Sequence, residues 1–513
     1  MRAETKTAVK NSVSRLVFVA LSVLTQVLWI MLLVMKINSY STWVSLFTSV
    51  LALVLVLWIY GRDMNANMKM PWIILILTLP VMGVCLYLLC GRSTVTKRMR
   101  QNFERIDKEL SVFQEQDEDV VDRLEADNEA VARQSYYIRR YASGMLYQNT
   151  DVMFYPDASE GIEAQKQALA RAEKFIFMEY HAIEDAEAFG EIKEILAKKA
   201  KEGVEVRLFY DDVGSIGFIN PDFIKRMQQQ GIACRVFNPL VPILYIFMNN
   251  RDHRKITVVD GKVGFTGGYN LANEYFNITH PYGQWKDTGV RLEGDAVRSL
   301  TLMFLEMWNA IEKSDTDYAK YLPQVTYTAK QKGFVQPYCD SPLDGERVGE
   351  NVYMNIIKNA KRYVYFMTPY LIPSDEMKRE LGLAAKRGVD VRIITPGIPD
   401  KKLVYKMTRS NYAGLVRDGV RIYEYTPGFC HAKQCVCDDE VATVGTINLD
   451  FRSLYLHFEN GVFLYDAPAV KEIKQDFEET MQVCREVTED YRYAGQKVPR
   501  IGQCILQLIA PLL

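Results

Sequence analysis

The residues of this chain that are best suited to chemistry stand in a short string that occurs twice. The first copy is His253-x-Lys255-x4-Asp260, and the second is His431-x-Lys433-x4-Asp438. Each copy continues to a small-residue turn and an asparagine at the same offset, Gly267-Gly268-Tyr269-Asn270 and Gly445-Thr446-Ile447-Asn448. Histidine, lysine and asparagine are residue types that attack and hold a phosphate group. The repetition therefore predicts one active site made of two related parts.

The chemistry that suits these residues is transfer of a phosphodiester between alcohols. Such a transfer needs a nucleophile, a proton donor for the leaving oxygen, and positive charge around the phosphoryl oxygens. The imidazoles of His253 and His431 can fill the first two roles at neutral pH. The two motif lysines can supply the charge, and Asn270 and Asn448 can act as neutral donors that bind the phosphate.

No cofactor and no metal is predicted for this site. The remaining histidines, His181, His280 and His457, lack a second histidine or cysteine at ligand spacing, so each is interpreted as structural. A working imidazole also needs a carboxylate on its other nitrogen to fix its tautomer. One candidate carboxylate follows each motif, Asp287 after the first and Glu459 after the second.

The motifs are predicted to lie on strand-turn-strand segments. The stretch 255–267 contains a β-branched run, an Asp-Gly turn and a second run. Because side chains alternate along a strand, the histidine and lysine of each motif are expected to face one cavity together. Asp260 and Asp438 fall where a strand meets its turn. We interpret them mainly as structural, with direct catalysis as the alternative.

The sequence around the motifs also repeats. In both halves a strand-like run leads to a helical stretch, a glycine at its end and a β-branched strand, with the glycines at Gly203 and Gly388. This order is typical of a βαβ unit. The chain is therefore predicted to be α/β, with two pseudo-repeated sandwich halves, each around a mixed sheet, at residues 136–335 and 336–495.

Three charge-free apolar runs precede these halves, at 16–35, 43–60 and 71–90. Each is close to the ~20 residues that cross a bilayer. We expect residues 1–92 to be a membrane anchor with two to three transmembrane helices. Either the N-terminus lies outside or one run fails to cross, and Pro80 and Gly83 make the third run a candidate for a bent or re-entrant segment. Residues 93–135 are predicted to be a charged, solvated helical connector. Residues 496–513 are expected to be an amphipathic tail that touches the bilayer, as does the apolar loop 239–248.

Charge and cysteine usage bear on the compartment and the partners. The basic residues that follow the third run, Arg92, Lys97, Arg98 and Arg100, place the catalytic halves in the cytoplasm by the positive-inside rule. Three of the nine cysteines crowd the second motif, which favours a reducing compartment. A net charge of −1 gives no general attraction to nucleic acid.

The duplicated motif resembles that of the phospholipase D superfamily, and the match is closer to bacterial cardiolipin synthases. Supporting features are Tyr87-Leu-Leu-Cys-Gly91-Arg92, the segment 210–215 and the terminal Ala510-Pro-Leu-Leu513. The resemblance implies an enzyme of the bacterial cell membrane that joins two phosphatidylglycerols into cardiolipin and glycerol. It implies that His253 forms a phosphatidyl-histidine, that His431 is the acid and base, and that Asp287 and Glu459 orient the histidines.

Other functions remain open at this stage. The same motifs serve a membrane-bound phospholipase D that hydrolyses lipids, a nuclease, or a non-catalytic membrane scaffold. Two complete motifs argue against a scaffold, and no basic, aromatic-rich surface supports a nuclease. A synthase and a lipase share their covalent intermediate, so membrane anchoring and the family resemblance favour the synthase. The sequence does not reveal the oligomeric state or the preferred acyl chains.

Overall fold

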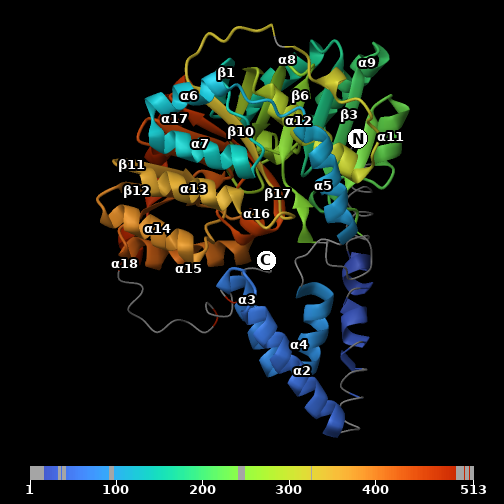
Figure 1. Cartoon of the computed structure of the whole chain (residues 1–513), viewed down its shortest axis with the longest axis vertical. Helices are drawn as coiled ribbons and strands as arrows, with labels where there is room; N and C mark the ends of the chain where they lie inside the picture. The colour runs from blue at the N-terminus through green and yellow to red at the C-terminus, as the bar shows by residue number, and fades with distance from the viewer. Residues whose placement is uncertain are drawn as a thin grey trace.

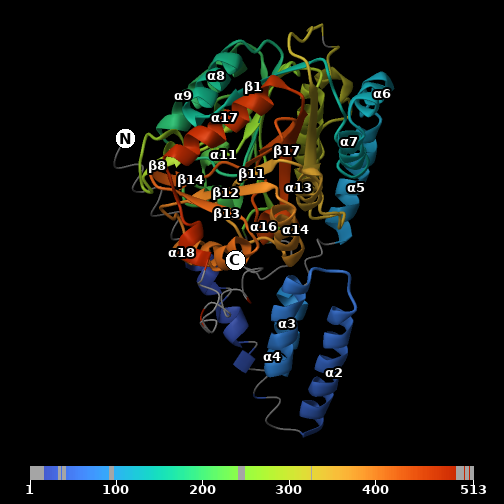
Figure 2. The ribbon, with the colours of Figure 1, turned by 90° about the vertical axis from the view of Figure 1, so that its left-hand side faces the viewer.

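The protein consists of a two-part α/β body and an N-terminal helical unit that extends from one end of it (Figures 1 and 2). The computed structural model describes residues 17–22, 24–29, 31, 32, 36, 42–91, 97–240, 249–324, 326–492, 502 and 508. Most of the loop 239–248 and of the tail 496–513 lies outside these residues. Their expected contact with the bilayer therefore stays a prediction.

The first half is built on a seven-stranded sheet in the order β1-β9-β7-β6-β2-β3-β4. Strands β2, β3 and β4 pair in parallel, and the other pairs are antiparallel. The bounds are β1 (Thr150–Tyr155), β2 (Phe175–Tyr180), β3 (Glu205–Asp211), β4 (Ala233–Phe237), β6 (Lys255–Val259), β7 (Val263–Gly267) and β9 (Gly289–Gly294).

The second half repeats this arrangement in the order β10-β17-β16-β15-β11-β12-β13-β18. Here β11, β12 and β13 are the parallel strands. The bounds are β10 (Phe334–Asp340), β11 (Tyr363–Met367), β12 (Asp390–Pro396), β13 (Arg421–Tyr425), β15 (Gln434–Cys437), β16 (Val441–Gly445), β17 (His457–Tyr465) and β18 (Cys484–Glu486). The predicted α/β fold with two repeated halves and mixed sheets is confirmed.

Helices form the layers around and between the two sheets. The outer face of the first sheet packs against α8 (Ala158–Ala170), α9 (Glu187–Lys201) and α11 (Phe223–Gln229). The outer face of the second packs against α13 (Val348–Asn359), α14 (Asp375–Lys386) and α15 (Lys402–Arg417). Between the sheets lie α12 (Val297–Ile311) and α17 (Pro468–Gln482), and one continuous core joins both halves there. This shared core fixes the two halves relative to each other.

The predicted connector is helical but not solvated. It contains α5 (Lys97–Ser111), α6 (Glu118–Asp127) and α7 (Glu129–Tyr141). On α5, Phe103, Ile106 and Leu110 recur at helical spacing and pack into the core between the sheets. The apolar stripes of α6 and α7 pack into the core of the second half. The abundant charge that suggested a solvated segment lies on the opposite faces of these helices.

The N-terminal unit contains α2 (Thr42–Tyr60), α3 (Ala66–Thr78), α4 (Pro80–Leu86) and the π-helix η1 (Tyr87–Gly91). The third apolar run is broken at Leu79, and Pro80 starts α4, a position where proline needs no backbone donor. Many large apolar side chains of α2 are exposed, including Trp43, Phe47 and Leu57. In the described part of the chain, no helix combines the length and hydropathy needed to cross a membrane.

Candidate active site

Each motif lies on a β-hairpin, and its aspartate holds the turn. Asp260 and Asp438 both adopt a left-handed backbone, with φ of 54° and 55°. The carboxylate of Asp260 accepts three backbone N–H groups at 2.7–2.9 Å, from Glu173, Lys174 and Phe175. That of Asp438 accepts the equivalent three at 2.7–2.8 Å, from Lys361, Arg362 and Tyr363. Both carboxylates thus tie a hairpin to the start of a central strand, and neither lines the pocket described below.

The chain leading into each motif histidine crosses to the other half. Strand β5 (Arg251–Asp252) pairs in parallel with β17, and β14 (Gly428–Cys430) pairs in parallel with β8 (Gln284–Lys286). The backbone N–H of His253 donates to the carbonyl of Phe458 at 2.9 Å, and that of His431 donates to the carbonyl of Lys286 at 2.7 Å. This reciprocal exchange brings the two motifs to one pocket.

The exchange also pairs each histidine with a carboxylate of the opposite half. Nδ1 of His253 lies 2.9 Å from both carboxylate oxygens of Glu459, and Nδ1 of His431 lies 2.6 Å from Oδ2 of Asp287. Both carboxylates are buried. Since an ionised carboxylate only accepts hydrogen bonds, Asp287 places the imidazole proton of His431 on Nδ1 and leaves the Nε2 lone pair for chemistry. Glu459 does the same for His253 in its ionised form.

The pocket has a cavity volume of about 430 Å³ and is lined by both motif histidines and both motif asparagines. Asn270 accepts from the backbone of Ala182 at 3.1 Å and donates to the hydroxyl of Tyr275 at 2.8 Å. Within the described residues, Oδ1 of Asn448 is buried without a hydrogen-bond partner. The two asparagines thus border the cavity, where a phosphate would meet them.

The two lysines lie beneath this lining, and each is 1% exposed. The ammonium of Lys255 donates to the carbonyl oxygen of His253 at 2.5 Å, and that of Lys433 donates to the carbonyl oxygen of His431. The lysines therefore place positive charge directly under the two histidines, although they do not line the cavity as the strand alternation predicted.

Comparison with known proteins agrees with this geometry. A family model described as "Cardiolipin synthase, PLD-like domain" matches residues 166–308 and 353–481, and one described as "Phospholipase_D-nuclease N-terminal" matches residues 50–92. Cardiolipin synthase 2 of Bacillus cereus is 34% identical over 435 residues, which cover 85% of this chain and 84% of that protein. A cardiolipin synthase of Staphylococcus aureus is 34% identical over 450 residues, covering 85% and 89%. The chain belongs to the cardiolipin synthase family of phospholipase D-like proteins.

Membership of the cardiolipin synthase family confirms the predicted resemblance, and the fold has a counterpart among solved structures. The phosphatidylserine synthase of Haemophilus influenzae matches with a TM-score of 0.54 at 15% identity, covering 75% of this chain and 98% of that one. This likeness shows that the two proteins share a fold.

The electrostatics of the site keep both motif histidines neutral in this family member. Burial and the ammonium of Lys255 lower the pKa of His253 well below its ordinary value. Burial and Lys433 lower the pKa of His431 to about 3, against the opposing effect of Asp287. Burial also lowers the pKa of Lys255 to about 8 and that of Lys433 to about 7. The imidazoles are therefore available as bases or nucleophiles, and the lysine charge is sensitive to pH near neutrality.

The two orienting carboxylates differ in their surroundings. Burial raises the pKa of Glu459 to about 8, against Lys255, and the hydroxyls of Ser453 (2.6 Å) and Thr446 donate to its oxygens. Burial acts on Asp287 in the same direction, but His431 and Lys433 outweigh it and lower the pKa of Asp287. Asp287 is thus firmly ionised beside His431, and Glu459 is held by three converging hydrogen bonds.

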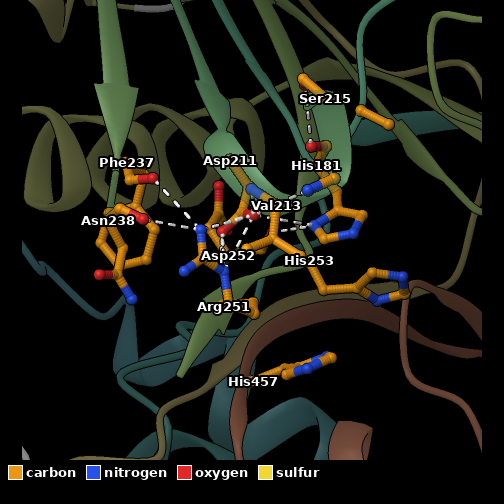
Figure 3. A network of polar contacts seen from close by, with 12 residues as sticks. His181, Asp211, Val213, Ser215, Phe237, Asn238, Arg251, Asp252, His253 and His457 are labelled. Atoms are coloured by element: carbon orange, nitrogen blue, oxygen red, sulfur yellow. Dashed lines mark hydrogen bonds and ion pairs between the residues drawn. The ribbon is translucent and has the colours of Figure 1, made fainter. Parts of the chain in front are cut away.

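Two histidines that the sequence suggested were structural line the pocket beside His253. The ring centroids of His181 and His457 lie 5.0 and 5.6 Å from that of His253 (Figure 3). One signal was present in the sequence, because His457 stands two residues before Glu459 and so shares its strand face. Among the described residues, His253, His457 and Glu459 are grouped closely enough to hold a metal ion. The carboxylate is already bound to His253, and we assign no metal there.

The segment 210–215 positions the first histidine. Asp211 ends β3 and binds the guanidinium of Arg251 at 2.8–3.0 Å, while its Oδ2 accepts the backbone N–H of Asp252 at 3.1 Å (Figure 3). Gly214 follows at a point where a Cβ would come within 2.2 Å of the carbonyl oxygen of His181. The segment therefore holds β5 and, through it, His253.

The N-terminal helical unit docks beside the pocket. Asn65, the N-cap of α3, donates from Nδ2 to Glu376 at 2.9 Å and to the hydroxyl of Tyr455 at 3.2 Å. Met68 of α3 packs in a cluster with Phe451, which begins α16 (Phe451–Tyr455) and lines the pocket. The N-terminal unit thus reaches the body close to the wall of the active site.

Proposed function

We propose that this pocket transfers a phosphatidyl group from one phosphatidylglycerol to another, giving cardiolipin and glycerol. The observation that carries the proposal is the pair of crossed histidine-carboxylate contacts at one cavity, with two lysines beneath, in a member of the cardiolipin synthase family. The relatives from Bacillus cereus and Staphylococcus aureus are named cardiolipin synthases and match over most of both chains.

In the first half-reaction, Nε2 of His253 attacks the phosphorus of the donor lipid. A P–N bond forms, the bond from phosphorus to the headgroup glycerol breaks, and the departing oxygen takes a proton from His431. The ionised Asp287 and the bound phosphate anion both favour the imidazolium form of His431. His253, by contrast, is surrounded by Lys255, His181 and His457, which favour its neutral, nucleophilic form.

In the second half-reaction, neutral His431 takes the proton from a headgroup hydroxyl of the second phosphatidylglycerol. The alkoxide oxygen attacks the phosphorus, the P–N bond breaks, and His253 returns with its electron pair. The lysine charges and the asparagine amides stabilise the phosphoryl oxygens in both steps. Water in place of the second lipid would give phosphatidic acid, which is the hydrolytic alternative.

We further propose that the N-terminal helices bury their apolar surface in the bacterial cell membrane as a multi-pass anchor, with the catalytic halves on the cytoplasmic side. The exposed apolar side chains of α2 and α3 support insertion. The contact of α3 with the pocket wall supports an active site that opens at the bilayer surface, where a lipid reaches it without leaving the membrane.

The test uses the full-length protein with phosphatidylglycerol vesicles and His253→Ala as the inactive control. We expect cardiolipin and an equal amount of free glycerol, with neither product from the variant. Phosphatidic acid without cardiolipin would show that the enzyme is a hydrolase. A cysteine is engineered into the α/β body, and intact cells are treated with an impermeant thiol reagent. Labelling of that cysteine would contradict the cytoplasmic placement.

A further inference from the structure

The two halves supply the same motif residues to the centre of the pocket, but they supply different residues to its walls. In the register of the two crossed strand pairs, Arg251 lies opposite His457, and at the equivalent positions Phe429 lies opposite Trp285. In each pair, one residue stands two positions before a motif histidine and the other stands two positions before an orienting carboxylate. One wall is thus built from a guanidinium and an imidazole, whereas on the other side Trp285 lines the cavity and Phe429 packs behind it.

A third pair of equivalent positions continues this contrast. Four residues after the motif asparagines stand Glu274 in the first half and Arg452 in the second, and both line the cavity. Nε of Arg452 lies 3.4 Å from Nε2 of His457, a contact that directs the guanidinium along the wall formed by Arg251 and His457. Arg251 is charge-paired with Asp211, and Arg452 lies near Asp450, a carboxylate that lines the same cavity, so the wall holds two guanidiniums together with these acids.

We refer to Arg251, Arg452 and His457 as the cationic wall, and we propose that it is a second phosphate subsite that holds the phosphate of the acceptor phospholipid. Arg452 is the residue that contacts the phosphate, and His457 positions it. The inference rests on the proposed function, because it concerns the second substrate of that reaction.

The charge of the two substrates explains the need for such a subsite. The phosphate of the donor occupies the space between the two histidines, above the two buried lysines. The acceptor brings another phosphate, joined to the attacking hydroxyl by a three-carbon glycerol, and the two anions repel each other. A guanidinium offers a planar fork of donors that matches a phosphate. The ring centroids of His457 and His253 lie 5.6 Å apart, so the wall adjoins the phosphorus that His253 attacks.

Neutral acceptors provide the test, because they need no second phosphate subsite. The full-length enzyme in phosphatidylglycerol vesicles is given labelled glycerol, and two rates are measured. Label entering phosphatidylglycerol reports the donor half-reaction with a neutral acceptor, and cardiolipin formation reports the reaction with the anionic one. For Arg452→Gln we expect cardiolipin formation to fall about 10- to 100-fold, the loss of a charge-assisted contact, while glycerol exchange stays within about threefold.

Matched variants keep the result interpretable. Arg452→Lys retains the charge and should recover much of the cardiolipin rate, and Glu274→Gln, at the equivalent position, should leave the ratio of the two rates unchanged. Should Arg452→Gln misfold, both rates fall, and His457→Gln then serves as the second probe, again with a selective loss of cardiolipin formation. Parallel loss of both rates in the folded variants, or equal rates for the Lys and Gln variants, would overturn the subsite. A wild-type enzyme that makes phosphatidic acid but no cardiolipin would instead overturn the proposed function.

Discussion

The two walls of the pocket descend from the same positions of a duplicated framework, yet they have different chemistry. Beside His253 stand the cationic wall and His181. Beside His431 stand Trp285 and Phe429, with ring centroids 5.1 and 5.8 Å from it. The histidines, lysines, asparagines and turn aspartates are the same in both halves. Duplication therefore supplies a symmetric centre, and divergence around it gives each histidine its own environment, as the separate roles proposed for them require.

The largest effect is expected from the histidines themselves. His253→Ala and His431→Ala should each lower turnover about 10²- to 10⁴-fold or more. A phosphatidyl ester of p-nitrophenol separates their roles, because this leaving group needs no proton. With it, His431→Ala should accumulate a phosphatidyl adduct on His253, detectable by mass spectrometry of the peptide, and His253→Ala should form none. An adduct on His431 in the His253→Ala enzyme would reverse the assignment.

The carboxylates should show the next largest effect. Asp287→Asn and Glu459→Gln remove the acceptor that fixes each imidazole, and each should lower turnover about 10- to 100-fold. If His431 is the acid, the p-nitrophenyl ester should restore the formation of the adduct in Asp287→Asn but not in Glu459→Gln. Equal rescue of both variants would mean that the two halves do not have separate roles.

A smaller effect is expected from pH. The ammonium groups of Lys433 and Lys255 lose their charge as pH rises through about 7 and about 8 in the free enzyme. In the proposed reaction the charge of these buried lysines stabilises the phosphate held above them, so kcat/KM should fall over this range. In Lys433→Arg the charge at position 433 persists to high pH. The midpoint of the remaining fall in kcat/KM should therefore move up towards the pKa of Lys255, about 8. A flat profile of kcat/KM to pH 9.5 in the wild type would contradict a role for the lysine charges.

The smallest effect on the reaction is expected from substitutions of Asp260 and Asp438, the aspartates at the hairpin turns. Asp260→Asn and Asp438→Asn weaken the binding of three backbone N–H groups and should destabilise the fold by about 1–3 kcal/mol. Thermal unfolding should report this loss, while turnover per folded molecule stays close to that of the wild type. A tenfold loss of turnover in a variant with unchanged thermal stability would favour the alternative of direct catalysis.

Much of this architecture could be predicted from the sequence because its signals are local. The β-branched runs around the Asp-Gly turn at 260 and 261 predicted the first hairpin, and the glycines Gly203 and Gly388 marked the ends of α9 and α14. These features follow from backbone preferences within a few residues. The repeated spacing of the motifs added the two halves and the shared site.

The connector shows where local signals were insufficient. The density of Asp and Glu between 104 and 133 suggested a solvated segment, although Phe103, Ile106 and Leu110 already had helical spacing. Whether such a stripe meets solvent or a core depends on which surface of the body needs covering. That surface exists only after the two sheets have packed together.

The sequence by itself determined the candidate reacting groups of this protein, two histidines, two lysines and two asparagines, and the aspartates that hold their turns, on two α/β halves. The tertiary structure alone decided that His253 pairs with Glu459 and His431 with Asp287, and that His457 and Arg452 line the cavity. The physical reason is that these contacts depend on β5 and β14, short strands that pair in parallel across the two halves. Pairing between residues more than 140 positions apart leaves no periodicity in the chain, and only the shared core brings the partners together.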